Sequence, residues 1–327
     1  MLYVLGIHHS GTTVLSNLLG QLDGFCTVGE LRSIWRKLTM PKTRCGCGTS
    51  LAACPVWNRI LQPIAGEGDD RLDRARAMWQ LQREVLPEHH GWLRGLSLAR
   101  RRGSGIAADS PLGRYARELS LLYRGIAEET GAQVIVDSSK DPADAALLLH
   151  MPEVDARVVQ IIRDPRGTVY SIVRFRGGGE SPAGSQLRRS AYAALSWSAG
   201  NLASAAVRRA RGPESSMLLR YEDVIRRPHE TIEALAEFAG HPARLAADAD
   251  PRTVTIHPTH TVGGNNNRFR TGPIQLREDT AWRSGMHRLD RVAVNTLCAP
   301  LMARYGYWPA ERSQSVSPES AASRADG

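Results

Sequence analysis

The chain opens with MLYVLGIHHSGTTVLSNLLGQL at residues 1–22, and this stretch decides the fold. Its apolar run at residues 2–5 has the length and flanks of a buried strand and ends at Gly6, where the chain turns. Residues 6–13 follow the pattern G-x-x-x-x-G-T-T, which has the spacing of a phosphate-binding loop with threonine in the usual lysine position. Apolar residues at helical spacing then continue to Leu22, so the loop leads into a helix N-terminus whose free N–H groups favour an anion. The stretch therefore predicts a phosphate cradle.

The missing lysine separates two kinds of chemistry. A loop that binds a nucleoside triphosphate needs a cation on the β- and γ-phosphates, whereas backbone N–H groups and hydroxyls suffice for one 5'-phosphate. The loop offers the hydroxyls of Ser10, Thr12 and Thr13. It therefore favours a single 5'-phosphate, and a glycine turn before a buried helix is the alternative interpretation.

Length and charge set the class of protein. The 327 residues suffice for one large α/β domain with insertions or for two smaller domains, and the formal net charge of +9 suits an anionic ligand. Because the basic residues form no single tail and no nucleic-acid-binding module is recognisable, we expect no nucleic-acid partner. The N-terminus has no basic leader and its apolar run is short, so we expect no signal peptide or membrane span and a cytoplasmic protein.

The five cysteines are an odd number, which argues against a full disulfide framework. Three of them, Cys45, Cys47 and Cys54, lie in RCGCGTSLAACPVW. A zinc site would need Cys26 or a histidine as the fourth ligand, because C-x-C with one further cysteine lacks the usual paired spacing. We therefore expect free thiols or a local disulfide, and no metal site.

Strands and helices alternate along the rest of the chain. We expect strands at residues 24–28, 133–137, 157–162 and 217–220, and helices at about 31–38, 112–130, 143–150, 186–211, 228–239 and 287–305, with a further helix opening at Pro165. This order predicts an α/β fold: a P-loop-like parallel sheet with helices on both faces and the ligand at the carboxyl ends of the strands. We expect one domain over residues 1–308, with a helical insertion at 39–105 that covers one side of the cleft and a disordered tail at 309–327.

Several side chains follow directly after predicted strands. Glu30 is placed for acid–base work, or alternatively is a helix N-terminal charge favoured by the dipole. Asp137 ends an apolar strand that resembles a magnesium-binding strand of kinases. Arg163 and Ser171 can together bind a second anion. Alternatively, Arg163 forms a salt bridge to Asp164 or another carboxylate, and Ser171 is a helix residue without a role in binding.

Two glycine-containing segments are expected near the site. Residues 175–185 have no periodicity and predict a mobile loop over it. In residues 257–270, the N–H groups of Gly263 and Gly264 with Arg268 and Arg270 can close over a phosphate, or the segment is a solvated loop.

Taken together, five ordered motifs resemble the sulfotransferases, which use 3'-phosphoadenosine 5'-phosphosulfate (PAPS) as sulfuryl donor. The motifs are SGTT at 10–13, VDSSK at 136–140, RDPRGTVYS at 163–171, LRYEDV at 219–224 and GGNNNRFR at 263–270. The resemblance extends to about residue 305, leaves 60–110 unmatched, and is closest to a bacterial branch with GELR and C-x-C-G…C-P-x-W segments after the loop. It implies a PAPS-dependent sulfotransferase with adenosine 3',5'-bisphosphate (PAP) as product and a hydroxyl acceptor on a small molecule, lipid or carbohydrate.

The resemblance also implies roles for individual residues. Donor-binding residues would be Ser10, Gly11, Thr12 and Thr13 at the 5'-phosphosulfate, Arg163, Ser171 and Arg268 at the 3'-phosphate, and Tyr221 by the adenine. Glu30 would be the acceptor base and Lys140 would approach the bridging oxygen. Many relatives carry lysine or arginine where this chain has His9, so Lys140 or protonated His9 would compensate. The alternatives are a P-loop kinase or NTPase that uses Asp137 and Thr12 for magnesium, and a non-catalytic nucleotide-binding protein.

Overall fold

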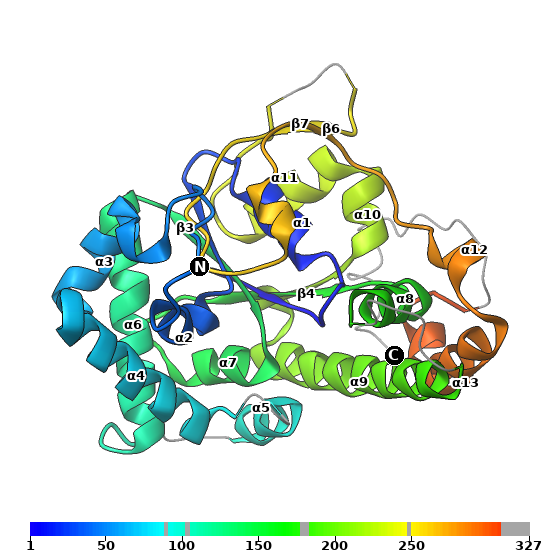
Figure 1. The fold of residues 1–327 in the computed structure, drawn as a ribbon, viewed down its shortest axis with the longest axis horizontal. Helices are drawn as coiled ribbons and strands as arrows, with labels where there is room; N and C mark the ends of the chain where they lie inside the picture. Colours follow the sequence, from blue (N-terminus) through cyan, green and yellow to red (C-terminus); the bar gives the residue numbers. More distant parts are fainter. Residues whose placement is uncertain (88–90, 102–104, 177–182, 247–249, 309–327) are drawn as a thin grey trace, which may run out of the picture.

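A five-stranded parallel sheet forms the centre of the protein, in a computed structural model that describes residues 1–87, 91–101, 105–176, 183–246 and 250–308. The strand order is β2-β3-β1-β4-β5, and every neighbouring pair is parallel. A separate antiparallel pair, β6 and β7, lies above it in Figure 1. The strands are β1 (Leu2–Leu5), β2 (Phe25–Gly29), β3 (Val134–Lys140), β4 (Arg157–Ile162), β5 (Ser216–Arg220), β6 (Thr253–Ile256) and β7 (Gly272–Gln275).

Helices connect the parallel strands, and their ends follow local sequence signals. For α6, the Ser110 hydroxyl accepts a hydrogen bond from the Gly113 N–H, Pro111 opens the helix, and Gly131 follows its end with a φ of 64°. The α-helices are α1 (Thr12–Leu19), α2 (Ile34–Leu38), α3 (Pro55–Ala65), α4 (Gly68–Val85), α5 (Gly91–Arg100), α6 (Pro111–Thr130), α7 (Pro142–Leu147), α8 (Pro165–Arg176), α9 (Ala183–Arg211), α10 (Tyr221–Arg226), α11 (Pro228–Phe238), α12 (Trp282–Gly285) and α13 (Arg288–Arg304). Short 3-10 turns are η1 (Leu31–Ser33), η2 (Leu51–Ala53), η3 (Leu148–His150), η4 (Pro213–Ser215) and η5 (Asn266–Phe269).

Each face of the sheet has its own apolar core because alternate strand residues point to opposite faces. In β1, Leu2 and Val4 belong to a cluster with α1, α10, α11 and the β6–β7 hairpin. Tyr3 and Leu5 belong to the other cluster, which α2 to α7 complete. Figure 1 shows α1, α10 and α11 on one side of the sheet and α7 and α9 on the other. The predicted α/β fold with helices on both faces is confirmed.

A third apolar cluster lies where the carboxyl end of β4 meets α8, α9 and α13. Trp197 on α9 is fully buried there, and its ring meets the Tyr305 ring edge to face at 6.5 Å. The Trp197 indole N–H donates to the carbonyl oxygen of Arg163 at 3.1 Å. This cluster therefore holds the strand end that carries Arg163.

Some elements differ from the expectations. The insertion is helical over α3, α4 and α5, which pack against α6 and α7. The segment that we expected to be a loop at 175–185 is helical at both described ends, in α8 up to Arg176 and in α9 from Ala183, and residues 177–182 lie outside the described residues. Helix α10 and the β6–β7 hairpin were not predicted. The tail at 309–327 also lies outside the described residues.

Candidate active site

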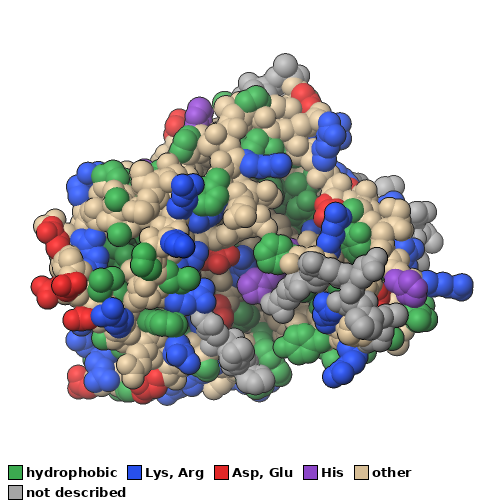
Figure 2. Space-filling view, in the orientation of Figure 1, with side chains coloured by type: hydrophobic (Ala, Val, Ile, Leu, Met, Phe, Trp, Pro, Cys, Tyr) green, Lys and Arg blue, Asp and Glu red, His purple; other side chains and the backbone are tan. Residues whose placement is uncertain are grey.

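A cleft of about 610 Å³ opens at the carboxyl ends of the parallel strands. The end of β1 contributes its phosphate-loop sequence, β2 contributes Glu30, β3 contributes Lys140, and β4 contributes Arg163. Figure 2 shows a hollow in the middle of this face, with histidine, acidic and basic side chains on its floor. The topology therefore brings residues that are far apart in the sequence to one edge of the sheet, as expected for an open α/β sheet.

The loop between β1 and α1 has the shape of an anion cradle. Gly11 precedes α1 with a φ of 93°, and a Cβ added there would lie 2.3 Å from the Tyr221 ring, so only glycine fits. Thr12 and Thr13 line the cleft. Ser10 is fully buried and donates its hydroxyl to the Ile7 carbonyl, so this side chain shapes the loop and does not face the cleft.

Two reactive side chains stand on unusual backbone. Among the described residues, the non-glycine residues with positive φ are His9, at 66°, and Lys140, at 73°. This left-handed conformation is uncommon for residues with a side chain, and where it occurs it clusters at functional sites. Both His9 and Lys140 line the cleft.

Glu30 and Lys140 form an ion pair inside the cleft, with the Lys140 ammonium donating to the Glu30 carboxylate. Burial disfavours the charged form of Glu30, but the charge and hydrogen bond of Lys140, with His8 and Lys37 beyond, outweigh it and lower the Glu30 pKa. The position of Glu30 is fixed by its own backbone, since its N–H donates to the Gly263 carbonyl at 3.4 Å. Glu30 is thus ionised and in direct contact with a cation.

Arg163 is a buried cation at the cleft wall. Its guanidinium donates to the His9 carbonyl at 3.1 Å and to the Asp279 carboxylate at 2.9 Å, and it lies 4.7 Å from the centre of the Tyr221 ring. The alternative expected for Arg163 was a salt bridge to Asp164 or another carboxylate, and the structure shows this salt bridge with Asp279 as the partner. Asp164 pairs with Arg166, at 2.6 Å. Asp279 was missed in the sequence because no motif surrounds it and only the fold brings it to Arg163.

Ser171 lies on α8, directly beside the loop. Its hydroxyl is 2.9 Å from His9 Nδ1, and the His9 ring lies 5.3 Å from the Phe175 ring. Ser171 and Arg163 both line the cleft and both contact His9, one through its ring and the other through its carbonyl. The two residues thus lie together on one wall of the cleft.

The segment after β6 crosses in front of the phosphate loop. The Asn265 N–H donates to the Thr13 hydroxyl at 3.3 Å, and the Asn17 side chain donates to the Asn267 carbonyl at 3.2 Å. Arg268 does not reach the cleft, because its guanidinium donates to the carbonyls of Thr261 and Arg44, at 3.0 and 2.9 Å.

Arg270, two residues further on, lines the cleft where Arg268 was expected. Arg268 instead ties the segment to the backbone beneath it. The two arginines look equivalent in the sequence, and only the fold supplies the carbonyl oxygens that turn one of them inward.

Asp137, the candidate magnesium ligand, is buried below the cleft and is not among its lining residues. Its carboxylate accepts hydrogen bonds from the Tyr123 hydroxyl at 2.8 Å and from the Ser139 N–H at 2.8 Å. Burial raises the Asp137 pKa to about 6, against the lowering effect of these hydrogen bonds. The carboxylate therefore serves the packing of β3 against α6.

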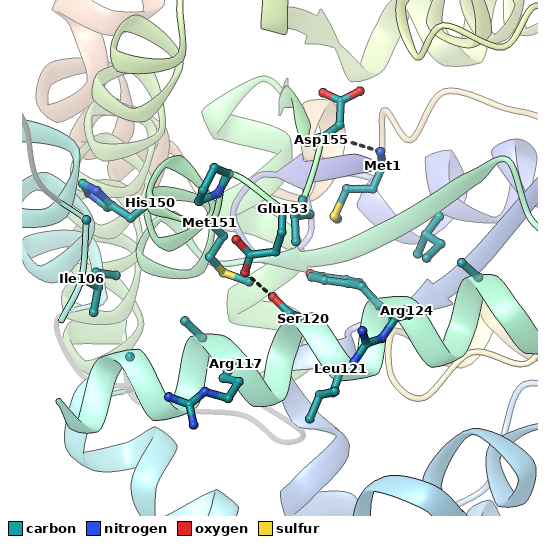
Figure 3. Close-up of a pocket in the computed structure, with 18 of the residues that line it drawn as sticks. Met1, Ile106, Arg117, Ser120, Leu121, Arg124, His150, Met151, Glu153 and Asp155 are labelled. Carbon is teal, nitrogen blue, oxygen red and sulfur yellow. Dashed lines mark hydrogen bonds between the residues drawn. The ribbon is translucent and has the colours of Figure 1, made fainter. Parts of the chain in front are cut away.

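A larger cavity of about 890 Å³ lies at the amino ends of β1, β3 and β4, away from the cleft. Figure 3 shows it between α6 and the turn before β4, with Arg117, Ser120 and Arg124 on the helix side. Ser120 donates to Glu153 across it. Since ligands of open α/β sheets bind outside the carboxyl ends of the strands, the smaller cleft is the candidate active site.

Comparison with known proteins then settles the family. The model of the sulfotransferase family matches residues 2–244, which is well over half of the chain. The chain belongs to the sulfotransferase family. Mouse carbohydrate sulfotransferase 3 is 28% identical to this family member over 171 residues, covering 49% of this chain and 35% of the mouse protein. The match thus spans about a third of the length of that curated relative.

Solved structures support the fold of this sulfotransferase family member. A sulfotransferase domain from the olefin synthase of Synechococcus PCC 7002 superposes with a TM-score of 0.52 at 17% identity, covering 92% of this chain and 94% of that one. A sulfotransferase domain from the curacin biosynthetic pathway gives a TM-score of 0.51 at 14% identity, covering 92% and 96%. In the described part of this family member, no helix combines the length and apolar character needed to cross a membrane.

Proposed function

We propose that this protein is a PAPS-dependent sulfotransferase that moves a sulfuryl group to an acceptor hydroxyl by direct in-line transfer. The observation that carries the proposal is one cleft in which an anion cradle, the Glu30–Lys140 pair and the Arg163–Ser171 wall face one another. Membership of the sulfotransferase family supports the same reaction.

The donor has an anion at each end, and the cleft offers a place for each. The cradle residues Gly11, Thr12 and Thr13 would hold the 5'-phosphosulfate through backbone N–H groups and hydroxyls. Arg163 and Ser171 would hold the 3'-phosphate, with Arg270 in place of Arg268 as the nearby cation. The apolar side chains of Ile256, Ile274 and Leu276 line the same cleft and suit a purine ring beside Tyr221.

In the proposed reaction, the Glu30 carboxylate takes the proton from the acceptor hydroxyl. The acceptor oxygen forms a bond to sulfur while the bond between sulfur and the bridging phosphate oxygen breaks, and PAP leaves with the added negative charge. Lys140, His9 and the loop N–H groups would stabilise that charge at fixed positions. When the donor binds, Lys140 would leave the Glu30 carboxylate and contact the donor. Glu30 would then be free to accept the proton.

Ligand binding distinguishes the proposed sulfotransferase from the alternative of a kinase or NTPase. PAP should raise the Tm of the purified protein in the presence of a metal chelator, whereas ATP with magnesium should have little effect, because a ligand that binds the folded state stabilises it. The buried Asp137, saturated with hydrogen bonds, favours this outcome. Stabilisation by ATP and magnesium, with none by PAP, would refute the donor assignment.

Glu30→Gln tests the chemical step. The variant should transfer labelled sulfate from PAPS about 10²- to 10⁴-fold more slowly than the wild type, because general-base catalysis is lost while the side chain keeps its shape. PAP should still raise its Tm. Glu128→Gln, at an exposed position on α6, is the matched control and should keep full activity. A Glu30→Gln variant with wild-type turnover would remove this residue from the mechanism.

The acceptor would carry a hydroxyl on a carbohydrate, a lipid or another small molecule. Carbohydrate acceptors come first in a screen, because the matched curated relative is named a carbohydrate sulfotransferase. Labelled-sulfate transfer over an acceptor library identifies the class, and PAP binding without transfer to any acceptor would favour a non-catalytic role. A cytoplasmic location stays a prediction from the sequence.

A further inference from the structure

Three cysteines and one histidine, outside the cleft, come together in the structure. The ligand atoms of Cys45, Cys47, Cys54 and His260 all lie within 4.8 Å of one another. Cys45 and Cys54 are fully buried, and the other two are half-buried. The cysteines are more than 200 residues from the histidine in the sequence, so this cluster is a product of the fold.

We infer that Cys45, Cys47, Cys54 and His260 form a structural zinc site. In a tetrahedral site, Zn–S bonds of about 2.3 Å and Zn–N bonds of about 2.0–2.1 Å place sulfur atoms about 3.8 Å apart and sulfur and nitrogen about 3.6 Å apart. The Sγ atoms of Cys47 and Cys54 are 3.9 Å apart, and His260 Nδ1 lies 3.3 Å from Cys54 Sγ and 3.8 Å from Cys45 Sγ. Three of the six edges of the cluster thus have lengths close to those of a zinc tetrahedron, and the other three are no longer than 4.8 Å.

The local backbone is built to bring these ligands together. The Cys45 N–H donates to the Thr49 carbonyl and the Gly48 N–H to the Cys45 carbonyl, both at 2.9 Å, which folds the C-x-C segment into a tight turn. A Cβ added to Gly46 would lie 2.5 Å from the Thr259 carbonyl oxygen, so only glycine lets the turn approach the histidine. On the other side, the Trp57 indole N–H donates to the His260 carbonyl at 2.8 Å.

Ligand chemistry selects zinc over the other candidates. Three thiolates and one imidazole in a closed tetrahedral arrangement are the ligands of structural zinc sites, whereas magnesium and calcium require oxygen ligands. A Cys47–Cys54 disulfide would use two of the four groups, and it would not explain why Cys45 and His260 lie beside them. The cysteines are all free in the structure. The expectation of no metal site is therefore replaced by this proposal.

The site would connect the turn at 45–54 to a segment that leads into the cleft. From Thr261 onward the chain that follows His260 runs beside β2, where the Val262 N–H donates to the Val28 carbonyl at 2.9 Å, and then reaches Gly263 beside Glu30. Zinc would therefore fasten the turn at 45–54 to the segment that positions Glu30 and carries Arg270. Its role is structural, because all four coordination positions are filled by protein groups.

Metal analysis of the full chain, purified from zinc-supplemented cells without chelator, tests the site. We expect one zinc ion per chain, and after exchange into cobalt we expect the visible absorption bands of tetrahedral thiolate-bound Co²⁺. His260→Ala and the half-buried Cys47→Ser should lose zinc almost completely. Cys26→Ser, the other cysteine in this part of the chain, is the matched control and should retain it.

Several results would overturn the site. These are a wild-type protein that contains no zinc and gives no such bands with added Co²⁺, zinc that stays bound in both variants, or a Cys47–Cys54 disulfide found by alkylation and peptide mapping. Wild-type metal content needs no variant to fold, and none of these measurements uses a sulfate donor. Failure of the zinc site and failure of the proposed function are therefore distinguishable.

Discussion

The Glu30–Lys140 ion pair places a base and a cation of the proposed reaction in direct contact. The charge of Lys140 keeps Glu30 ionised, which prepares it to accept a proton but also weakens it as a base. The loss of this contact on donor binding would raise the affinity of Glu30 for the acceptor proton when it is needed. One residue thus controls the basicity of the other.

The pH profile of kcat/KM tests this coupling. Because kcat/KM for PAPS reports the free enzyme, in which Lys140 contacts Glu30 and lowers its pKa, this quantity should fall with decreasing pH only below the usual glutamate pKa of about 4.3. Lys140→Met removes the largest of the lowering effects while burial, which raises the Glu30 pKa, remains, so the acidic limb should move to higher pH. The exposed Lys42→Met is the control and should leave the limb in place. Superimposable limbs in all three proteins would contradict the coupling.

Arg163 offers a planar fork that lysine cannot reproduce. Arg163→Lys should weaken PAP binding by about 10- to 150-fold, because a charge-assisted hydrogen bond contributes about 1.5–3 kcal/mol. Binding of adenosine 5'-phosphate, which lacks the 3'-phosphate, should change much less, and calorimetry compares the two ligands. The exposed Arg188→Lys is the control. An equal loss for both ligands would place Arg163 away from the 3'-phosphate.

At the scale of elements, the contact between the phosphate loop and α10 is close. The Tyr221 ring at the start of α10 lies against Gly11, so the cradle and the wall of the cleft fix each other. Gly11→Ala should therefore cost about 2 kcal/mol or more and abolish stabilisation by PAP, through backbone strain and overpacking together.

Gly131 provides the control for this prediction. It has a φ of 64° but no neighbour within 4 Å of an added Cβ, and it lies at the end of α6. Gly131→Ala should cost about 1–2 kcal/mol from backbone strain alone and leave PAP binding intact. Denaturant unfolding and thermal shift compare the two variants. Equal losses of unfolding free energy and equal Tm shifts with PAP would show that the Tyr221 contact contributes to neither stability nor binding.

The elements that were predictable from sequence are those with a strong local pattern. The buried parallel strands are continuous apolar runs, and α6 and α13 have clear periodicity, so β1, β3 and β4 were found close to their observed bounds. The β6–β7 hairpin was missed because its strands are four residues each and β7 contains Gly272 and Pro273, which usually mark a turn.

The same limit applies to the candidate site. Glu30, Lys140, Arg163 and Ser171 were predicted because each follows a strand or belongs to a motif, and the structure brings them to one cleft. The inward turn of Arg268 and the pairing of Asp279 with Arg163 depend on contacts across more than 100 residues. No local pattern encodes such contacts.

At the scale of the whole molecule, the third apolar cluster supports the cleft from behind. Trp197 connects it to the Arg163 carbonyl. Trp197→Ala should lower the free energy of unfolding by about 3–5 kcal/mol, and Trp197→Phe by less. Trp197→Phe should also weaken PAP binding, since it loses the hydrogen bond that fixes the Arg163 backbone. Denaturant unfolding and calorimetry measure both effects.

Trp92→Phe is the control for this prediction, because Trp92 on α5 is 37% exposed. Its stability should change by no more than about 0.5 kcal/mol. A Trp197→Phe variant with unaltered PAP affinity would uncouple the cluster from the cleft.

The strand order β2-β3-β1-β4-β5 places the candidate site residues in two groups, one on each side of the middle strand β1. Arg163 and Tyr221 follow the strands on one flank of β1, and Glu30 and Lys140 follow the strands on the other. In the proposed reaction the first flank serves an invariant nucleotide, while the second meets whatever molecule is to be modified. In this proposed reaction, new acceptor specificities would evolve through changes in the half of the sheet that carries the long insertion after β2. The half that recognises the nucleotide would stay the same.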